Sequence, residues 1–238
     1  MPAEKIAIVG TGTDVGKTVL SLLIMQYLFS QGQNPLYIKP FQTGCNHPGE
    51  PGTDAAFIYE NIVQLKGSDP SYSIINCHNN PKAPYFAARD MNQQIDVKET
   101  LSIIKEKEDA GMNGKNISHL VIEAAGGLLV PVNKDITVAD FIVQTSARPI
   151  IAAHAGLGTI NHTLLTIQCF EHLGVKPVGV VLMDTGHKKT DPDMVNENIE
   201  AIESFSGIRV AGVIEPIKNF VSLCPKARKV IEQILKLI

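Results

Sequence analysis

A short apolar run leads into a glycine-rich turn and then into a helix-like stretch: Lys5-Ile-Ala-Ile-Val-Gly10-Thr-Gly-Thr-Asp-Val15-Gly-Lys-Thr18. The apolar run predicts a strand over residues 5–9, and the apolar periodicity of residues 17–31, which stops at Gly32, predicts a helix. Consecutive backbone N–H groups in such a turn form a concave nest, and the helix N-terminus adds partial positive charge. This strand, turn and helix together predict a loop that binds the phosphates of a nucleotide.

The loop supplies a continuous set of candidate nucleotide contacts: Gly12, Thr13, Asp14, Val15, Gly16, Lys17 and Thr18. Lys17 offers a full positive charge to the β- and γ-phosphates. Thr18 offers a hydroxyl to Mg²⁺, which accepts one or two protein oxygens and takes its other ligands from phosphate and water. Because Thr11 stands where the common spacing has glycine, we expect a longer loop. An ordinary turn with an exposed lysine would leave these glycines and threonines unexplained.

Further short apolar runs alternate with amphipathic stretches along the chain. Strands are predicted over 35–39, 119–123, 149–153, 177–183 and 208–214, and helices over 54–65, 96–108, 159–173, 192–205 and 225–238. Because several runs are almost continuously apolar, they favour a parallel sheet that is covered on both faces. We therefore predict an α/β fold of the phosphate-loop NTPase type, with a doubly wound, mostly parallel sheet flanked by helices. One domain over residues 1–238 suffices, and residues 76–85 read as an ordered loop near the site.

The composition excludes several classes of function. A formal net charge of −3 gives no basic face for nucleic acid or anionic lipid. No apolar run reaches about 18 residues, and the N-terminus lacks the apolar core of a signal peptide. The C-terminal amphipathic helix, residues 225–238, is better explained by packing on the domain than by lying on a membrane. We expect a cytoplasmic protein that contacts neither nucleic acid nor membrane.

Metal-binding and nucleophilic patterns are weak in this sequence. The four cysteines are widely spaced and form no Cys-x-x-Cys pair, so we expect free thiols in a reducing compartment. The seven histidines show no metal-ligand spacing, and His154 and His162 read as core or helix-surface residues. No Gly-x-Ser-x-Gly elbow is present.

Three polar side chains follow or end predicted strands, where ligands bind in sheets of this kind. Lys39 emerges beside the phosphate loop, and a buried lysine there favours contact with substrate or phosphate over a plain salt bridge. Asp54, after Thr53, either caps a helix or binds Mg²⁺, and the spacing leaves both open. Glu123 precedes a predicted Gly126-Gly127 turn, where it either binds nucleotide-bound Mg²⁺ or caps that turn.

Taken together, a set of motifs resembles the dethiobiotin synthetases over most of the chain. These motifs are the phosphate loop, Tyr37-Ile38-Lys39-Pro40, Asp54, Ala83-Pro84, Glu123 with Gly126-Gly127, Val130-Pro131 and Gly158-Thr159-Ile160-Asn161-His162. The resemblance implies ATP-dependent carboxylation and ring closure of 7,8-diaminopelargonate with CO₂, giving dethiobiotin, ADP and phosphate for biotin biosynthesis. The reaction passes through a carbamate and a carbamic-phosphoric anhydride. This reaction needs no nucleophilic side chain, which agrees with the lack of an obvious Ser/His or Cys/His catalytic motif in the sequence.

The resemblance also assigns roles to residues. It implies that Thr13, Lys17 and Lys39 are catalytic and hold phosphates or the carbamate, and that Mg²⁺ binds Thr18, Asp54 and Glu123. The remaining matches form a substrate set of Lys39, Thr43, Gly126, Gly158 and Asn161, and a nucleobase set of Met183, Asp184 and Pro216. Gly158 and Asn161 match the region that receives the substrate's carboxylate across a homodimer interface.

Four positions depart from the family pattern. Ala124 replaces a glycine, Tyr85 stands where histidine often follows Ala-Pro, and Glu215 is inserted before Pro216. Met183 stands where an asparagine commonly reads the base, and a thioether has no hydrogen-bond donor. We therefore predict poor discrimination among nucleotides, unless the adjacent Asp184 reads the base instead.

Two other activities remain as alternatives. One is an amidating synthetase resembling the cobyrinic acid diamide synthetases, which normally carry a glutaminase domain for which this chain has no room. The other is a partition or positioning ATPase that acts as a nucleotide switch. Such switches usually have a second lysine early in the phosphate loop, where this chain has Gly10-Thr11-Gly12-Thr13.

Overall fold

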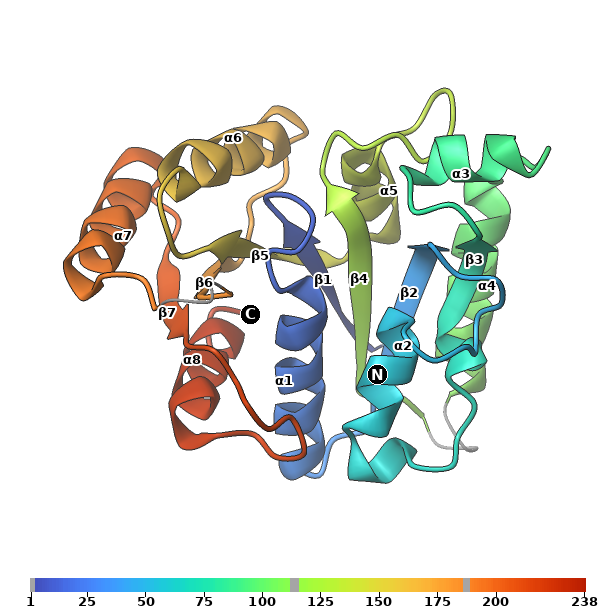
Figure 1. The fold of residues 1–238 in the computed structure, drawn as a ribbon, viewed down its shortest axis with the longest axis horizontal. Coiled ribbons are helices and arrows are strands. Elements are labelled where there is room, and N and C mark those ends of the chain that lie inside the picture. Colours follow the sequence, from blue (N-terminus) through green and yellow to red (C-terminus); the bar gives the residue numbers. More distant parts are fainter. Residues whose placement is uncertain (1–2, 112–115, 186–188) are drawn as a thin grey trace.

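A parallel sheet made from the apolar runs forms the centre of the structure (Figure 1). The computed structural model describes residues 3–111, 116–185 and 189–238. Within these residues, seven parallel strands lie in the order β3-β2-β4-β1-β5-β6-β7. The strands are β1 Glu4–Gly10, β2 Pro35–Thr43, β3 Ile74–His78, β4 His119–Gly127, β5 Arg148–His154, β6 Gly179–Met183 and β7 Val210–Ile214. The predicted α/β class is confirmed, and the sheet is parallel throughout.

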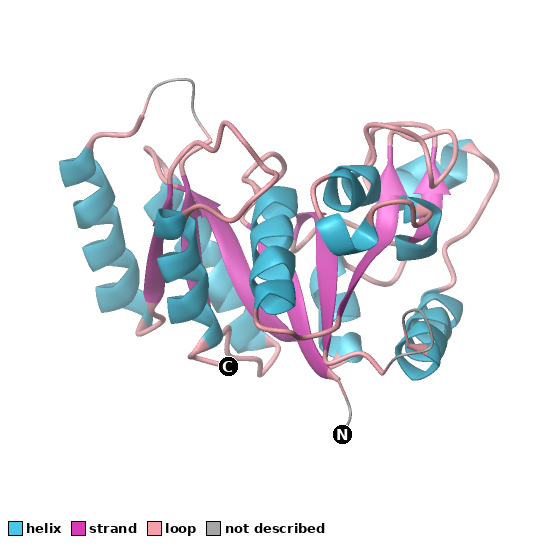
Figure 2. Cartoon of the chain, turned by 90° about the horizontal axis from the view of Figure 1, so that it is seen from below, coloured by secondary structure: helices cyan, strands magenta, loops and turns pink. Residues whose placement is uncertain are grey.

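Helices cover both faces of this sheet, as Figure 2 shows in the turned view. One face carries α1 (Lys17–Ser30), α2 (Asp54–Glu60) and α8 (Pro225–Leu235). The other carries α4 (Val97–Ala110), α5 (Val138–Thr145), α6 (Thr159–His172) and α7 (Pro192–Ser206). Helix α3 (Pro84–Asp90) lies beyond the end of β3, and 3₁₀ turns occupy Val63–Leu65 and Pro70–Ser73. The doubly wound prediction is therefore confirmed.

Helix α1 is held firmly because it packs against the sheet and also against α2 and α8. Its sequence is apolar on almost every side, and Leu20, Leu22 and Ile24 are fully buried. Strand β1 in the centre of the sheet is equally enclosed, with Ile6 and Ile8 fully buried. The strand and helix that flank the phosphate loop are thus packed firmly into the core of the fold.

The sequence-based ranges differ most from the structure at three strands, β2, β3 and β4. Residues 76–78, predicted as loop, belong to β3, where Phe41 pairs with Asn76 and Thr43 with His78. A run of Asn, Cys and His carries no strand signal, so pairing with β2 determines the local structure. Strands β2 and β4 each extend four residues beyond their predicted ends. As a result Glu123 lies inside β4 rather than at its end.

The strand β3 also changes the prediction for the cysteines. Cys45 follows β2 and Cys77 lies in β3, and the register of the two strands places their Cα atoms 6.2 Å apart, joined as a disulfide. The expectation of four free thiols is therefore wrong for this pair, which 32 residues separate in the sequence. Cys169 and Cys224 are free thiols, as predicted.

Helix α8 packs on the domain, as its apolar stripe predicts. Val230, Ile231 and Ile234 are buried, and the helix contacts β6, β7 and α1. The Arg148 guanidinium donates hydrogen bonds to the carbonyl oxygens of Leu237 and Ile238, which holds the end of the chain against β5. Across the described residues, no helix has both the length and the apolar character needed to cross a membrane.

Candidate active site at the carboxyl ends of β1, β2 and β4

The phosphate loop connects β1 to α1 in a conformation that requires glycine. Gly16, which caps α1, has φ 92° and ψ 22°, in the left-handed region that other residues adopt only with strain. A Cβ at Gly16 would also lie 3.0 Å from the Cε of Met183 on β6. At the start of the loop, a Cβ at Gly10 would lie 2.8 Å from Val15 Cγ2. Gly16 is therefore required by backbone conformation and by packing, and Gly10 by packing alone.

Lys17 folds back over this loop. Its Nζ donates a hydrogen bond to the Gly12 carbonyl oxygen at 2.7 Å, and only 7% of the residue is exposed. Burial, followed by the nearby Lys39 ammonium, lowers the pKa of Lys17 to about 8 against the opposing pull of Glu123, Asp54 and Asp14. A phosphate bound beside this lysine would oppose the effect of burial and favour its protonated form, because an opposite charge nearby stabilises the ammonium.

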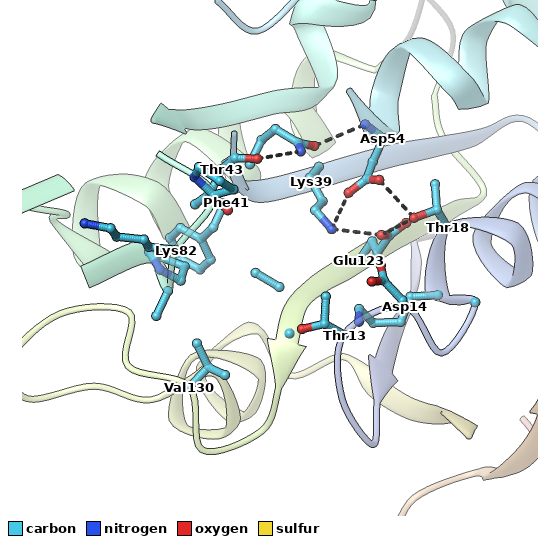
Figure 3. Close-up of a pocket in the computed structure, with 18 of the residues that line it drawn as sticks. Thr13, Asp14, Thr18, Lys39, Phe41, Thr43, Asp54, Lys82, Glu123 and Val130 are labelled. Carbon is cyan, nitrogen blue, oxygen red and sulfur yellow. Dashed lines mark hydrogen bonds and ion pairs between the residues drawn. The ribbon is translucent and has the colours of Figure 1, made fainter. Parts of the chain in front are cut away.

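Two carboxylates, a hydroxyl and an ammonium meet beside the loop (Figure 3). Thr18 Oγ1 lies 3.0 Å from Asp54 Oδ1 and 2.9 Å from Glu123 Oε1. Lys39 Nζ lies 2.7 Å from Asp54 Oδ2 and 2.8 Å from Glu123 Oε1. The Thr18 hydroxyl has one hydrogen, so it can donate to only one carboxylate at a time. Positive charge is therefore the main factor that holds the two carboxylates together.

The protonation states in this cluster follow from its charges. Burial on its own would lower the pKa of Lys39, but the Glu123 and Asp54 carboxylates raise it above its ordinary value. Burial would likewise raise the pKa of Asp54, but the Lys39 ammonium holds it below its usual range. Lys39 is thus a fixed cation between two anions, and it is far more enclosed than a typical lysine, with 4% of the residue exposed.

The structure argues against the capping role that the sequence left open for Asp54 and Glu123. Thr53 caps α2 by accepting a hydrogen bond from the Ala56 N–H at 3.2 Å, which leaves the Asp54 carboxylate facing the cluster. Glu123 is fully buried inside β4 and does not cap a turn. The predicted turn at Gly126 is instead the end of the strand, where Gly126 has φ 63°.

Sequence reasoning missed the role of Tyr37. Its hydroxyl donates to Glu123 Oε2 at 2.9 Å, and 1% of the residue is exposed. Burial, together with the charge of Glu123, raises the pKa of Tyr37 well above its ordinary value, so the phenol keeps its proton. The signal was present in the period of two along β2, which places Tyr37 and Lys39 on the same face of the strand.

A cavity of about 670 Å³ extends from the phosphate loop to α3, within the range of small-molecule sites. It brings together most of the predicted residues: Thr13, Asp14, Gly16, Lys17, Thr18, Lys39, Thr43, Asp54, Glu123 and Gly126. Figure 3 shows Thr43 and Lys82 at the end of the cavity away from Thr18. Val15 packs beneath the loop instead, where 8% of it is exposed.

A second cavity of about 200 Å³ lies near the start of α1 and brings together Met183, Asp184 and Pro216. Met183 is 2% exposed and packs against Gly16. The Asp184 carboxylate is occupied, because it accepts hydrogen bonds from Thr190 N and Thr190 Oγ1 at 3.0 Å each. Neither side chain can therefore both donate a hydrogen bond to a base and accept one from it, as an amide would.

Gly158 and Asn161 are predicted substrate-binding residues that line neither cavity in this chain. Gly158 caps α6 with φ 88°, and Asn161 is exposed in the first turn of that helix. The neighbouring Leu157 is 92% exposed. His154, read from the sequence as a core or surface residue, accepts a hydrogen bond from Gly156 N at Nδ1.

The chemistry of the oxygen donors fits Mg²⁺. Two carboxylates and one hydroxyl converge at the head of the phosphate loop, and Mg²⁺ prefers one or two carboxylates completed by phosphate oxygens. In the part of the chain that the structure describes, no group of three or more His, Cys, Asp and Glu side chains forms a metal cage made of protein alone. Thr18, Asp54 and Glu123 are therefore suited to a cation that arrives with a nucleotide.

Comparison with solved structures places the fold among ATPases with phosphate loops. The cell division protein MinD of Aquifex aeolicus superposes with a TM-score of 0.60 at 17% identity, covering 99% of this chain and 97% of that one. The cell division ATPase MinD of Pyrococcus furiosus gives a TM-score of 0.60 at 15% identity, covering 98% and 99%. At these identities the likeness concerns the fold alone.

Comparison by sequence is more specific. Residues 4–222 match a family model described as an AAA domain. The chain is 32% identical to the ATP-dependent dethiobiotin synthetase BioD of Paramagnetospirillum magneticum, over 88% of this chain and 87% of that protein. It is 34% identical to the protein of the same name from Bacillus cereus, over 87% and 81%. The chain therefore belongs to the family of ATP-dependent dethiobiotin synthetases.

Proposed function

We propose that this protein catalyses the ATP-dependent carboxylation and ring closure of 7,8-diaminopelargonate with CO₂, giving dethiobiotin, ADP and phosphate. The observation that carries this proposal is the convergence of Lys17, Lys39, Thr18, Asp54 and Glu123 in one cavity next to the phosphate loop. A carbamate and a triphosphate are both anions. Bringing them together therefore requires positive charge more than a strong base.

The lysines and threonines divide this work along the cavity. Lys17 and the backbone of the loop, with Thr13, hold the phosphates, since Lys17 Nζ already lies over the loop. Lys39 lies between the phosphate end and Thr43, where it can hold the carbamate against the γ-phosphate. Thr43 and Gly126 also line this cavity, and the proposal assigns them to the binding of the diamine. No covalent intermediate with the protein is needed.

The Mg²⁺ site consists of Thr18, Asp54 and Glu123. Bound there with ATP, the cation would neutralise negative charge on the phosphates. In this structure the Lys39 ammonium neutralises the negative charge of the Asp54 and Glu123 carboxylates. Thr18 is positioned by the first turn of α1, so its hydroxyl stays aligned with the loop.

The working unit in this proposal is a homodimer. Gly158 and Asn161 lie outside the cavity of their own chain, and exposed Leu157 and Leu129 flank the ends of β5 and β4. A second copy that covers these leucines would bring its own α6 toward the diamine. Closed two-fold pairing is also the commonest arrangement of oligomers.

The test is the dependence of ATP hydrolysis on the diamine. We expect ADP release to rise at least tenfold when 7,8-diaminopelargonate and bicarbonate are both present. A partition or positioning ATPase would hydrolyse ATP without the diamine, and an amidating synthetase would require an amine donor instead. Equal hydrolysis with and without the diamine would overturn the proposal.

A further inference from the structure

The two oxygens of the Glu123 carboxylate have different partners. Lys39 Nζ and Thr18 Oγ1 contact Oε1 at 2.8 and 2.9 Å, on the side of the cavity. The Tyr37 hydroxyl contacts Oε2 at 2.9 Å from within the core. The phenol therefore holds one oxygen while the other faces the residues proposed to bind Mg²⁺.

We propose that Tyr37 is a positioning residue that fixes the orientation of the Glu123 carboxylate for a divalent cation. This inference rests on the proposed Mg²⁺ site. The phenol itself touches neither metal nor substrate, and it acts through Glu123. Partners of this kind, behind the direct ligands, typically change metal affinity by about 10- to 100-fold when they are removed.

Burial makes the contact strong. Glu123 is fully buried and Tyr37 is 1% exposed, so solvent cannot easily replace the phenol. Without it, Oε2 would be a buried charged acceptor that lacks a hydrogen bond, which is costly. The carboxylate would relieve that cost by rotating toward other donors, and Oε1 would then leave its place beside Thr18 and Asp54.

Tyr37 is itself well fixed. It pairs with Val121 in the register of β2 and β4, two residues from Glu123 along β4. Its carbonyl oxygen accepts a hydrogen bond from Ser73 Oγ at 2.7 Å. The backbone on both sides of the phenol is thus anchored, so the hydroxyl has little freedom to follow a moving carboxylate.

The same region provides a matched control. Tyr59 on α2 is also buried, with 5% exposed, and its hydroxyl lies 2.9 Å from Ser73 Oγ. Tyr59→Phe therefore removes a buried phenol hydroxyl whose partner is neutral. Tyr37→Phe removes one whose partner is the Glu123 carboxylate. A difference between the two variants isolates the contact with the carboxylate.

The experiment measures Mn²⁺ affinity by electron paramagnetic resonance, with the β,γ-imido analogue of ATP at saturation. We expect Tyr37→Phe to weaken Mn²⁺ binding about tenfold, which corresponds to about 1.4 kcal/mol. Tyr59→Phe should stay within about twofold of the parent. In turnover assays, Tyr37→Phe should raise the half-saturating Mg²⁺ concentration by a similar factor, with the KM for the diamine changed by less than about twofold.

Glu123→Gln separates this inference from the proposed function. If Glu123→Gln weakens Mn²⁺ binding strongly and Tyr37→Phe behaves like Tyr59→Phe, the role of Tyr37 is wrong while the metal site stands. If Glu123→Gln also leaves Mn²⁺ affinity unchanged, the metal site itself is wrong. Thermal unfolding checks each variant, and Tyr37→Met, which fills similar space without a hydroxyl, should reproduce the tenfold loss if the phenylalanine variant folds poorly.

Discussion

At the scale of single residues, one ammonium and one hydroxyl in the site each contact the same two carboxylates. Lys39 neutralises both Asp54 and Glu123, and the Thr18 hydroxyl lies within hydrogen-bond distance of the same two carboxylates. Among the described residues Lys17 forms no ion pair with a carboxylate, and its Nζ donates a hydrogen bond to a carbonyl oxygen of its own loop. The lysine that is available for phosphate is therefore Lys17, whereas Lys39 first has to give up strong contacts.

Lys17→Ala should reduce turnover about a thousandfold while leaving the fold intact. Removing a charge that stabilises the developing phosphoryl transition state costs several kcal/mol. Among the described residues the Lys17 ammonium makes one hydrogen bond, to the Gly12 carbonyl oxygen, so we expect the fold to survive its removal. Turnover and circular dichroism of the same preparation check this. Turnover within tenfold of the parent would contradict the role given to Lys17.

Met183 predicts weak discrimination among nucleotides. The thioether packs under Gly16 and the neighbouring Asp184 accepts hydrogen bonds from Thr190, so we expect neither side chain to read the base. One polar pair contributes about 1 kcal/mol, and its loss should leave ATP, GTP and CTP within about tenfold in kcat/KM. Product formation at equal, subsaturating nucleotide concentrations checks this. An ATP preference above about a hundredfold would show that another group reads the base.

At the scale of elements, β3 shows how tertiary pairing determines what a short polar segment becomes. Its His78 is 4% exposed, and no hydrogen-bond partner for Nδ1 exists among the described residues. Burial lowers the pKa of His78 below its ordinary 6.5. The native protein therefore holds this histidine neutral at a pH where the unfolded chain would take up a proton.

His78→Phe should stabilise the protein, most of all in mild acid. As the pH falls below about 6.5, His78 binds a proton in the unfolded chain before it does so in the native state. The free energy of unfolding therefore decreases with falling pH until the lower pKa of the native state is reached. Phenylalanine removes that loss and also removes a buried polar atom, a gain of about 1 kcal/mol or a few degrees in Tm. Thermal unfolding at pH 7.5 and 5.5 checks the effect. His162→Phe, at an exposed position, is the control. The prediction would be refuted if Tm changed equally with pH in the parent and in His78→Phe.

The elements that the sequence predicts well are those whose local pattern and packing agree. The strand and helix around the phosphate loop are apolar with clear start and stop signals, and β1 and α1 match their predicted ranges closely. Strand β3 and the ends of β2 and β4 were missed because their residues form strand only through pairing. The roles of Thr53 and Tyr37 depend on contacts between segments far apart in the chain, which spacing alone does not reveal.

At the scale of the whole molecule, the site lies where the sheet changes its winding direction. Strand β1 and its neighbour β4 are followed by connections to opposite halves of the sheet, β1 to β2 and β4 to β5. This switch point opens a crevice at the carboxyl ends of the strands, the usual position for ligands in doubly wound sheets. Gly158 and Asn161 lie outside the cavity within one chain, which is why we propose a second copy.

Leu157→Asp should give a monomer and raise the KM for the diamine at least tenfold, with ATP affinity within about twofold. A charge on a side chain that is 92% exposed costs the single chain little, but it would be buried in the proposed interface. Light scattering compares the mass with 25.8 kDa for one chain. Phe205→Asp, at an 82% exposed position near the end of α7, is the control and should stay dimeric. A fully active monomeric parent would refute the shared site.

The most direct test of the central claim is to follow the carbon that the enzyme is proposed to add. Purified protein is supplied with ATP, Mg²⁺, 7,8-diaminopelargonate and ¹³C-labelled bicarbonate, and the product is analysed by mass spectrometry beside Lys17→Ala. We predict dethiobiotin with one labelled carbon per molecule, one ADP released for each product, and almost no product from the variant. ATP hydrolysis that continues without the diamine, or that yields no labelled dethiobiotin, would contradict the account.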